Sequence, residues 1–284
     1  MSDATPDPTP DPATRSPATR AITAGRRPDD TALTPALWAT SVWESADLLD
    51  ATARATTVRA DRFYGRYGNP TVQAFEEAIA ELEGAEAALA TGSGMGAIAT
   101  TILALCSAGD HIVAQQQLYS GTLAFLNGPC QRFGIEVTFV DATVPGAVAA
   151  AVRPGRTMLV LVETPSNPRL DLVDLDEIGA IVGPFTVVDS TFATPLGQQP
   201  LRHGVDLVLH SATKGIAGHN DATIGVVAGE AELIDALWSY SVLHGATASP
   251  FDALNALRGL RTLPVRLAHQ HAGALALAER LLDH

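Results

Sequence analysis

Lys214 is the only lysine among the 18 basic residues of this 284-residue chain, and all the others are arginines. A general preference for arginine explains the arginines but not the one lysine. A guanidinium stays protonated, whereas a lysine amine can lose its proton and attack a carbonyl carbon. Lys214 is therefore the first candidate for chemistry, as a lysine that forms a Schiff base.

Three polar residues are candidates for holding a phosphorylated ring. Ser211 and Thr213 flank it with hydroxyl groups that can bind phosphate oxygens, although an ordinary loop has the same composition. Asp189 ends the run 186–189, where its carboxylate can keep a pyridinium nitrogen protonated or can simply cap a helix.

Two tyrosines and an arginine complete the candidate set. Tyr119 can stack on an aromatic cofactor, or it can be a half-buried core residue. Tyr64 and Arg66 offer a phenol and a guanidinium suited to a phosphate dianion, or they can belong to an exposed loop.

A glycine-rich turn between a strand and a helix is expected at residues 87–107. The apolar run 87–91 leads into Gly92-Ser93-Gly94-Met95-Gly96 and then into an apolar helix. This arrangement presents backbone N–H groups to a phosphate, although tight turns also use glycine. A helix over 70–83 precedes it, with Asn69 as N-cap and Gly84 at its end.

The middle of the chain alternates between apolar runs and helix-like segments. The other expected strands are 111–114, 135–140, 158–163, 186–189, 206–210 and 224–228. This rhythm predicts an α/β fold with a largely parallel sheet, which binds its ligand at the carboxyl ends of the strands. Glu163, Asp189 and His210 each end one of these runs, so we expect their side chains to converge.

Several motifs in order resemble the cystathionine γ-synthase family, the pyridoxal-phosphate enzymes of cysteine and methionine metabolism. They are 64–71 (YGRYGNPT), 93–95 (SGM), Tyr119, 163–168 (ETPSNP), 189–192 (DSTF), 211–214 (SATK) and 258–263 (RGLRTL). The resemblance runs from about Ala32 to the last residue. It implies the type I fold of pyridoxal-phosphate-dependent transferases, with a mostly parallel seven-stranded sheet flanked by helices.

The resemblance also implies a role for each candidate residue. Lys214 would bond to pyridoxal 5′-phosphate, Asp189 would pair with the pyridine nitrogen, and Tyr119 would stack on the ring. The phosphate would bind the backbone of Gly94 and Met95 and the hydroxyls of Ser211 and Thr213. Asn167 would lie near the cofactor's phenolic oxygen or the substrate carboxylate. Tyr64 and Arg66 would reach the neighbouring subunit's cofactor, which implies a homodimer at least and, as is usual in the family, a tetramer built as a dimer of dimers.

The implied activity is γ-elimination or γ-replacement on a small amino-acid substrate, either cystathionine or an O-acylhomoserine. Two alternatives remain open: an O-acylhomoserine sulfhydrylase, and a truncated inactive homologue that only binds cofactor or associates with other subunits. Ser190 and Gly215 depart from the family's usual asparagine and aromatic residue. Gly121 stands where methionine γ-lyases have cysteine, which weighs against that subgroup.

We expect four segments: a disordered tail over 1–27, an extended arm over 28–62, a cofactor-binding α/β domain over 63–245 and a helical linker over 246–284. The family continues into a small C-terminal domain that supplies an arginine for the substrate carboxylate. We expect that domain to be missing here, with turnover weak as a result. No sequence motif identifies Arg258, Arg261 or Arg266 as a substitute for the arginine that binds the substrate carboxylate.

Composition narrows the class of protein. The net charge of −13 disfavours nucleic acid and anionic membrane surfaces as partners. Neither a secretory signal nor a bilayer-length apolar stretch is expected. Cys106 and Cys130 lie in apolar runs and are expected to be buried, reduced thiols, so a cytoplasmic protein without a metal site is predicted.

Overall fold

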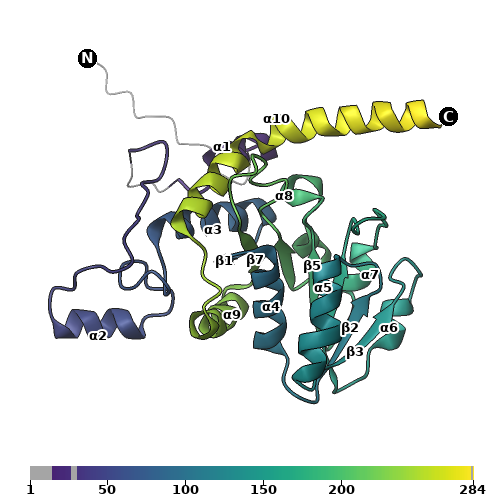
Figure 1. Cartoon of the computed structure of the whole chain (residues 1–284), viewed down its shortest axis with the longest axis horizontal. Helices are drawn as coiled ribbons and strands as arrows, with labels where there is room; N and C mark the ends of the chain where they lie inside the picture. Colours follow the sequence, from purple (N-terminus) through teal and green to yellow (C-terminus); the bar gives the residue numbers. More distant parts are fainter. Residues whose placement is uncertain (1–14, 27–30, 283) are drawn as a thin grey trace, which may run out of the picture.

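Seven short strands form one mixed sheet in the spatial order β1-β7-β6-β5-β4-β2-β3 (Figure 1). The computed structural model describes residues 15–26, 31–282 and 284. The strands are β1 (Ala87–Thr91), β2 (His111–Gln115), β3 (Glu136–Val140), β4 (Thr157–Glu163), β5 (Phe185–Asp189), β6 (Leu207–His210) and β7 (Gly225–Gly229). Strands β6, β5, β4, β2 and β3 run parallel, whereas β7 is antiparallel to both β6 and β1. The predicted α/β fold and mostly parallel sheet are confirmed.

Helices cover both faces of this sheet. One face carries α4 (Gly94–Leu105), α5 (Ser120–Phe125) with a π-helical continuation (Leu126–Cys130), and α9 (Ala231–His244). The other carries α1 (Pro17–Thr23), α3 (Pro70–Glu83), α6 (Ala147–Ala151), α7 (Leu175–Gly179), α8 (Thr194–Gly197) and α10 (Pro250–Leu281). A 3₁₀ turn (Pro200–His203) precedes β6. Because side chains alternate along a strand, neighbours such as Val208 and Leu209 enter different cores.

Helix α3 begins and ends as its sequence predicts. The Asn69 side chain accepts a hydrogen bond from the Thr71 amide, Pro70 occupies the first helical position, and Gly84 ends the helix at φ 73°. Phe75 is fully buried on the side of α3 that faces the sheet. These contacts fix the segment that leads into β1 and the glycine-rich turn.

Residues 17–23 form helix α1, so the predicted disordered tail is wrong for this part of it. Ser16 caps the helix by accepting from the Thr19 amide, and Ala21 is fully buried. The helix contacts α3 and α10, and these contacts stabilise it. Both partners are distant in the sequence, so the local composition could not predict the contacts. Residues 1–14 and 27 of the predicted tail lie outside the described residues.

The predicted extended arm also contains a helix, α2 (Leu48–Thr56), capped by Asp47. None of its residues is buried, and Leu48 and Leu49 are both more than 80% exposed, at 82% and 81%. Figure 1 shows α2 in a long segment that extends away from the sheet. Residues 28–30 of this segment lie outside the described part.

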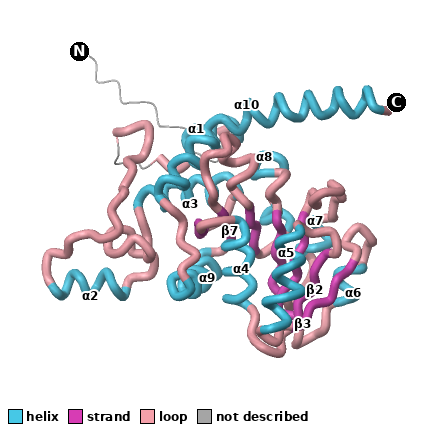
Figure 2. Tube along the Cα trace, in the orientation of Figure 1, coloured by secondary structure: helices cyan, strands magenta, loops and turns pink. Residues whose placement is uncertain are grey.

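Helix α10 packs on α3 and α1 through its first half. Its second half projects beyond the other elements, as Figure 2 shows, and residues 268–282 are exposed. Among the described residues, no helix is both long and apolar enough to cross a bilayer.

Candidate active site

A cavity of about 310 Å³ lies where β4, β5 and β6 end and α4 begins. Eight of the ten predicted site residues line it: Gly94, Met95, Tyr119, Asn167, Asp189, Ser211, Thr213 and Lys214. The other lining residues are Ser93, Ile98, Glu163, Thr191, Phe192 and Thr223. Parallel strands that end at one edge bring these distant segments together.

The start of α4 supplies backbone donors on one side of this cavity. Ser93 is the N-cap, and its Oγ accepts from the Gly96 amide at 3.0 Å. The amides of Gly94 and Met95 stand in the first turn, where a helix offers no acceptor of its own. Together with the helix dipole, they form an environment that favours an anion.

Gly94 is required by a close approach to Ser211. A β-carbon at position 94 would lie 2.6 Å from the Ser211 Cβ and 2.8 Å from its Oγ, which is closer than real β-carbons come. The absence of a side chain lets α4 begin directly against the loop that follows β6. The amide donors and the hydroxyl of Ser211 therefore share one side of the cavity.

Asp189, the last residue of β5, is 7% exposed and lines the cavity. Its Oδ1 accepts from the Thr191 amide at 3.0 Å and from the Thr191 Oγ1 at 2.6 Å. No described residue donates to Oδ2, so one carboxylate oxygen remains available to a ligand. Burial raises the pKa of Asp189, and the bonds from Thr191 and the nearby His210 oppose that rise.

Glu163, the last residue of β4, is the paired neighbour of Asp189 in the parallel register. Its Oε2 accepts from the Tyr119 amide at 2.7 Å, and its Oε1 accepts from the Asn167 amide at 2.9 Å. Burial and the charge of Asp189 raise its pKa to about 7, and the two backbone bonds oppose that rise. The sequence marked Glu163 only as a strand end and assigned it no role.

Lys214 lies in the loop that follows β6. The loop is held by bonds from the Lys214 amide to the Ser211 carbonyl and from the Gly218 amide to the Lys214 carbonyl. Thr213 fixes the loop to the chain before β7, since its Oγ1 both donates to the Ile224 carbonyl and accepts from the Ile224 amide. The lysine is exposed and also borders a second cavity of about 660 Å³.

His210 does not join this cavity, so the expectation that it converges with Glu163 and Asp189 is wrong. Its side chain points to the opposite face of the sheet, where Nε2 lies 2.6 Å from Oε1 of Glu83. Both side chains are fully buried. On β5, Asp189 points to the same side of the sheet as Val187, because side chains two residues apart share a face. On β6, His210 likewise points to the same side as Val208. Val187 and Val208 lie in the cores on opposite faces, so Asp189 and His210 point away from each other.

Tyr119 stands at the start of α5 with its side chain 43% exposed. The ring folds over Gly121, where a β-carbon would lie only 2.5 Å from the Tyr119 Cε1. The glycine at this position therefore allows the tyrosine ring to adopt its place beside Met95 in the cavity wall.

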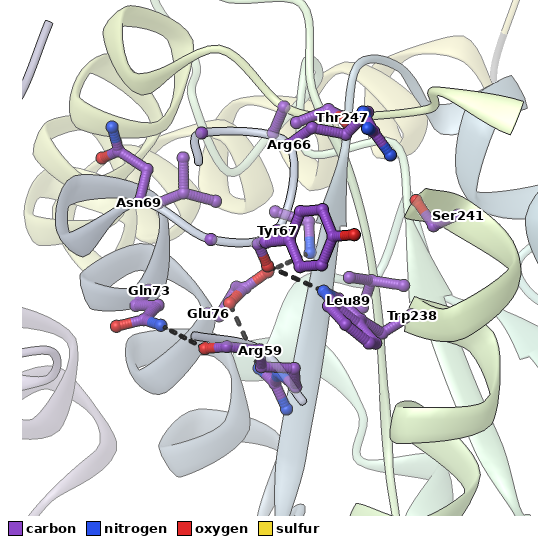
Figure 3. A pocket seen from close by; sticks show the side chains of 15 residues that line it. Arg59, Arg66, Tyr67, Asn69, Gln73, Glu76, Leu89, Trp238, Ser241 and Thr247 are labelled. Carbon is purple, nitrogen blue, oxygen red and sulfur yellow. Dashed lines mark hydrogen bonds and ion pairs between the residues drawn. The ribbon is translucent and has the colours of Figure 1, made fainter. Parts of the chain in front are cut away.

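Tyr64 and Arg66 do not line the Lys214 cavity. Arg66 borders a separate space of about 30 Å³, where it lies near Tyr67 (Figure 3). Its guanidinium lies over the rings of Tyr64 and Tyr67 at 5.2 and 5.4 Å and donates to the Val242 carbonyl at 2.5 Å. The Tyr64 side chain is 38% exposed.

The two cysteines are buried free thiols, as predicted. Burial raises the pKa of Cys106 to about 12 and that of Cys130 to about 11. Neither lines the cavity, and protonated thiols of this kind are poor nucleophiles.

Two curated proteins are similar to this chain in sequence. The chain is 43% identical over 267 residues to an O-succinylhomoserine sulfhydrylase of Pseudomonas aeruginosa, covering 93% of this chain and 66% of the relative. It is 42% identical over 228 residues to an L-methionine gamma-lyase of Treponema denticola, covering 78% of this chain and 57% of the relative. The chain thus spans less than two thirds of the length of these two curated relatives.

A solved structure has the same fold. The cystathionine gamma synthase of Xanthomonas oryzae, determined in complex with aminoacrylate and cysteine, superposes with a TM-score of 0.87 at 39% identity. The match covers 95% of this chain and 69% of that protein. The family described as Cys/Met metabolism PLP-dependent enzyme matches residues 18–284. The chain therefore belongs to the family of Cys/Met metabolism PLP-dependent enzymes.

Proposed function

We propose that the chain binds pyridoxal 5′-phosphate in the Lys214 cavity and catalyses elimination or replacement at the γ-carbon of an amino acid. One observation carries the proposal: a single cavity is lined by the only lysine, a buried carboxylate with a free oxygen and the first turn of a helix. Family membership supports the same cofactor.

The residues of the cavity fit this cofactor group by group. The Gly94 and Met95 amides, with the Ser211 and Thr213 hydroxyls, are a donor set for a phosphate dianion. The free Oδ2 of Asp189 suits a protonated ring nitrogen.

Two further side chains would hold the ring itself. Tyr119 offers an aromatic face for stacking, and Asn167 offers an amide for a phenolic oxygen or a substrate carboxylate.

Bound pyridoxal phosphate supplies an aldehyde that bonds to amines and a ring that withdraws electrons from the substrate's α-carbon. Lys214 would bond to that aldehyde at rest and give up this bond to the substrate's amine. Its freed Nζ would then take the α-proton and next a proton from Cβ, and the electron pair left at Cβ would expel the group on Cγ. Asp189 would keep the ring nitrogen protonated throughout.

We propose cystathionine or an O-acylhomoserine as the substrate, with cystathionine γ-lyase or γ-synthase activity. The O-acylhomoserine sulfhydrylase activity is the second candidate, supported by the 43% identity to an enzyme of that name. Purified chain is given cystathionine alone, or O-succinylhomoserine with either cysteine or sulfide. Release of 2-oxobutyrate, or formation of cystathionine or homocysteine, identifies the reaction. Silence with every substrate from protein that holds the cofactor favours the cofactor-binding homologue instead.

We propose that the chain assembles at least into a homodimer, with a tetramer as the expected form, and that two subunits share each site. Tyr64 and Arg66 support this, because both lie outside the Lys214 cavity of their own chain while matching the family's phosphate-binding motif. We also propose the cytoplasm as its place of action, since both cysteines are free thiols, as expected in a reducing compartment.

A further inference from the structure

The Glu163 carboxylate joins the two loops that carry the ring-facing residues of the cavity. One loop precedes α5 and ends at Tyr119, and the other follows β4 and contains Asn167. Glu163 accepts from the backbone amides of both, at 2.7 and 2.9 Å, and is itself only 5% exposed. Its own amide donates to the Gln115 side chain at 2.9 Å, which fixes the end of β4 against β2.

An ionised carboxylate is the form that satisfies both backbone partners of Glu163. Both partners are backbone N–H groups, which are permanent donors, and an ionised carboxylate accepts at both oxygens. A glutamine would turn an NH₂ group toward one of the two amides and lose that bond. A protonated carboxyl group would accept more weakly at its hydroxyl oxygen and so would hold one of the two amides less firmly.

The charges around Glu163 come from three sides of the cavity. Asp189 on β5 is its paired neighbour in the register, Tyr119 begins α5, and Lys214 follows β6. The start of α4 brings no titratable side chain to the cavity. His210 faces the other side of the sheet, where it bonds to Glu83. The dominant charge near Glu163 is therefore the negative one of Asp189.

We propose that Glu163 is a positioning residue whose ionised carboxylate holds Tyr119 and Asn167 in place for the cofactor ring, and whose ionisation is coupled to the pairing of Asp189 with that ring. The inference rests on the proposed function of the cavity. Glu163 acts through other residues, since both of its carboxylate oxygens already accept from the backbone.

The coupling follows from the adjacent negative charges. In the chain alone, burial and Asp189 raise the pKa of Glu163 to about 7. A protonated ring nitrogen at Asp189 neutralises that neighbour and so favours the ionised form of Glu163. By reciprocity, ionisation of Glu163 then favours ring binding, and affinity should rise as the pH increases through neutrality.

The test compares wild type with Glu163→Gln and with Glu177→Gln as a matched control. Glu177 also accepts a backbone amide from a distant segment, that of Gly146 at 2.7 Å, but it lies outside the cavity. The probe is pyridoxamine 5′-phosphate, which has no aldehyde and so does not depend on Lys214. Its dissociation constant is measured between about pH 6 and pH 8.

We expect Glu163→Gln to weaken probe binding roughly tenfold at the upper pH and to flatten its pH dependence relative to wild type. Glu177→Gln should behave as wild type. An unchanged pH dependence in Glu163→Gln overturns the inference alone, because the wild-type chain still binds the probe. Failure of the wild-type chain to bind the probe overturns the proposed function and this inference together.

A second measurement needs no variant and no cofactor. Hydrogen exchange of the Tyr119 and Asn167 amides in the wild-type chain is expressed as a protection factor, which removes the intrinsic pH dependence of exchange. Protection of both amides, taken relative to that of amides in the sheet core, should rise as Glu163 ionises. Protection that is independent of pH at both amides contradicts the inference even if Glu163→Gln does not fold.

Discussion

Glu163 and Asp189 occupy paired positions at the ends of the adjacent parallel strands β4 and β5, so two carboxyl groups meet at one cavity. The two carboxylates differ in their hydrogen-bond partners. Glu163 uses both oxygens on backbone amides, whereas Asp189 uses one oxygen on Thr191 and keeps the other free. Glu163 therefore bonds to the protein with both oxygens, whereas Asp189 keeps one oxygen for the ring nitrogen that we propose it binds.

This pairing predicts a distinct pH dependence of stability. Glu163 has a pKa of about 7 in the folded chain against an ordinary 4.5, so the folded state keeps a proton that the unfolded chain has lost. The extra stability is fully present below pH 4.5 and is lost as the pH rises through 7. At about 1.4 kcal/mol per pKa unit, the loss is on the order of 3 kcal/mol.

Urea unfolding of the cofactor-free chain at several pH values measures this effect. Wild type should lose stability relative to Glu163→Gln between about pH 5 and pH 8. Equal changes with pH in the two proteins would show that Glu163 titrates normally in the fold.

Gly94→Ala should damage the anion site at the start of α4. The new β-carbon would stand 2.6 Å from the Ser211 Cβ, so α4 must move away from the loop that follows β6. Overpacking of this kind costs roughly 1–3 kcal/mol, and we expect a tenfold or greater rise in the dissociation constant of pyridoxal phosphate. Equilibrium dialysis against the cofactor gives the constant.

Gly128→Ala is the matched control, because a β-carbon placed there would meet no heavy atom within 4 Å beyond its chain neighbours and the backbone of its own helix. It should bind the cofactor as wild type does. Equal affinities in the two alanine variants would rule out the contact between Gly94 and Ser211 as a determinant of binding.

Sharing of sites between subunits predicts complementation. Arg66→Ala chains keep Lys214 but lack the guanidinium, and Lys214→Arg chains have the opposite defect. If Arg66 serves a neighbouring subunit, mixed oligomers contain complete sites, and borohydride labelling of Lys214 with pyridoxal phosphate should rise when the two proteins are refolded together.

Arg62→Ala is the control in this experiment, since Arg62 lies over Trp38 at 5.2 Å in the same segment and outside the cavity. Its labelling should equal that of wild type before and after mixing. Labelling in the Arg66→Ala mixture that stays at the unmixed level contradicts the sharing of sites.

The sequence predicts the sheet and most of the cavity because these depend on local patterns. Apolar runs locate the strands, and strand ends such as Asp189 identify the ligand-binding edge. The side chain that each strand end presents to that edge depends on its register, and no local pattern showed that His210 points to the other face. The sequence did not predict the contacts of Glu163 for a similar reason, because its partners Tyr119 and Asn167 come from two separate loops.

In the segments before α3, the sequence did not predict which helices form or which of them are buried. Helix α1 lies in a stretch with a polar, proline-rich composition, and its burial against α3 and α10 comes only from the tertiary fold. Helix α2 has an N-cap and an apolar pair, Leu48 and Leu49, yet it buries nothing within this chain. Composition describes neither outcome.

The proposed bond between the Lys214 amine and the aldehyde of pyridoxal phosphate is tested by mixing the protein with the cofactor, reducing the mixture with borohydride and digesting it. Because Lys214 is the only lysine, a stable pyridoxyl group on a side-chain amine has one position to occupy. We expect a visible absorbance band before reduction, a labelled Lys214 peptide after it, and neither in Lys214→Arg. A colourless wild-type protein with an unlabelled Lys214 peptide would contradict it.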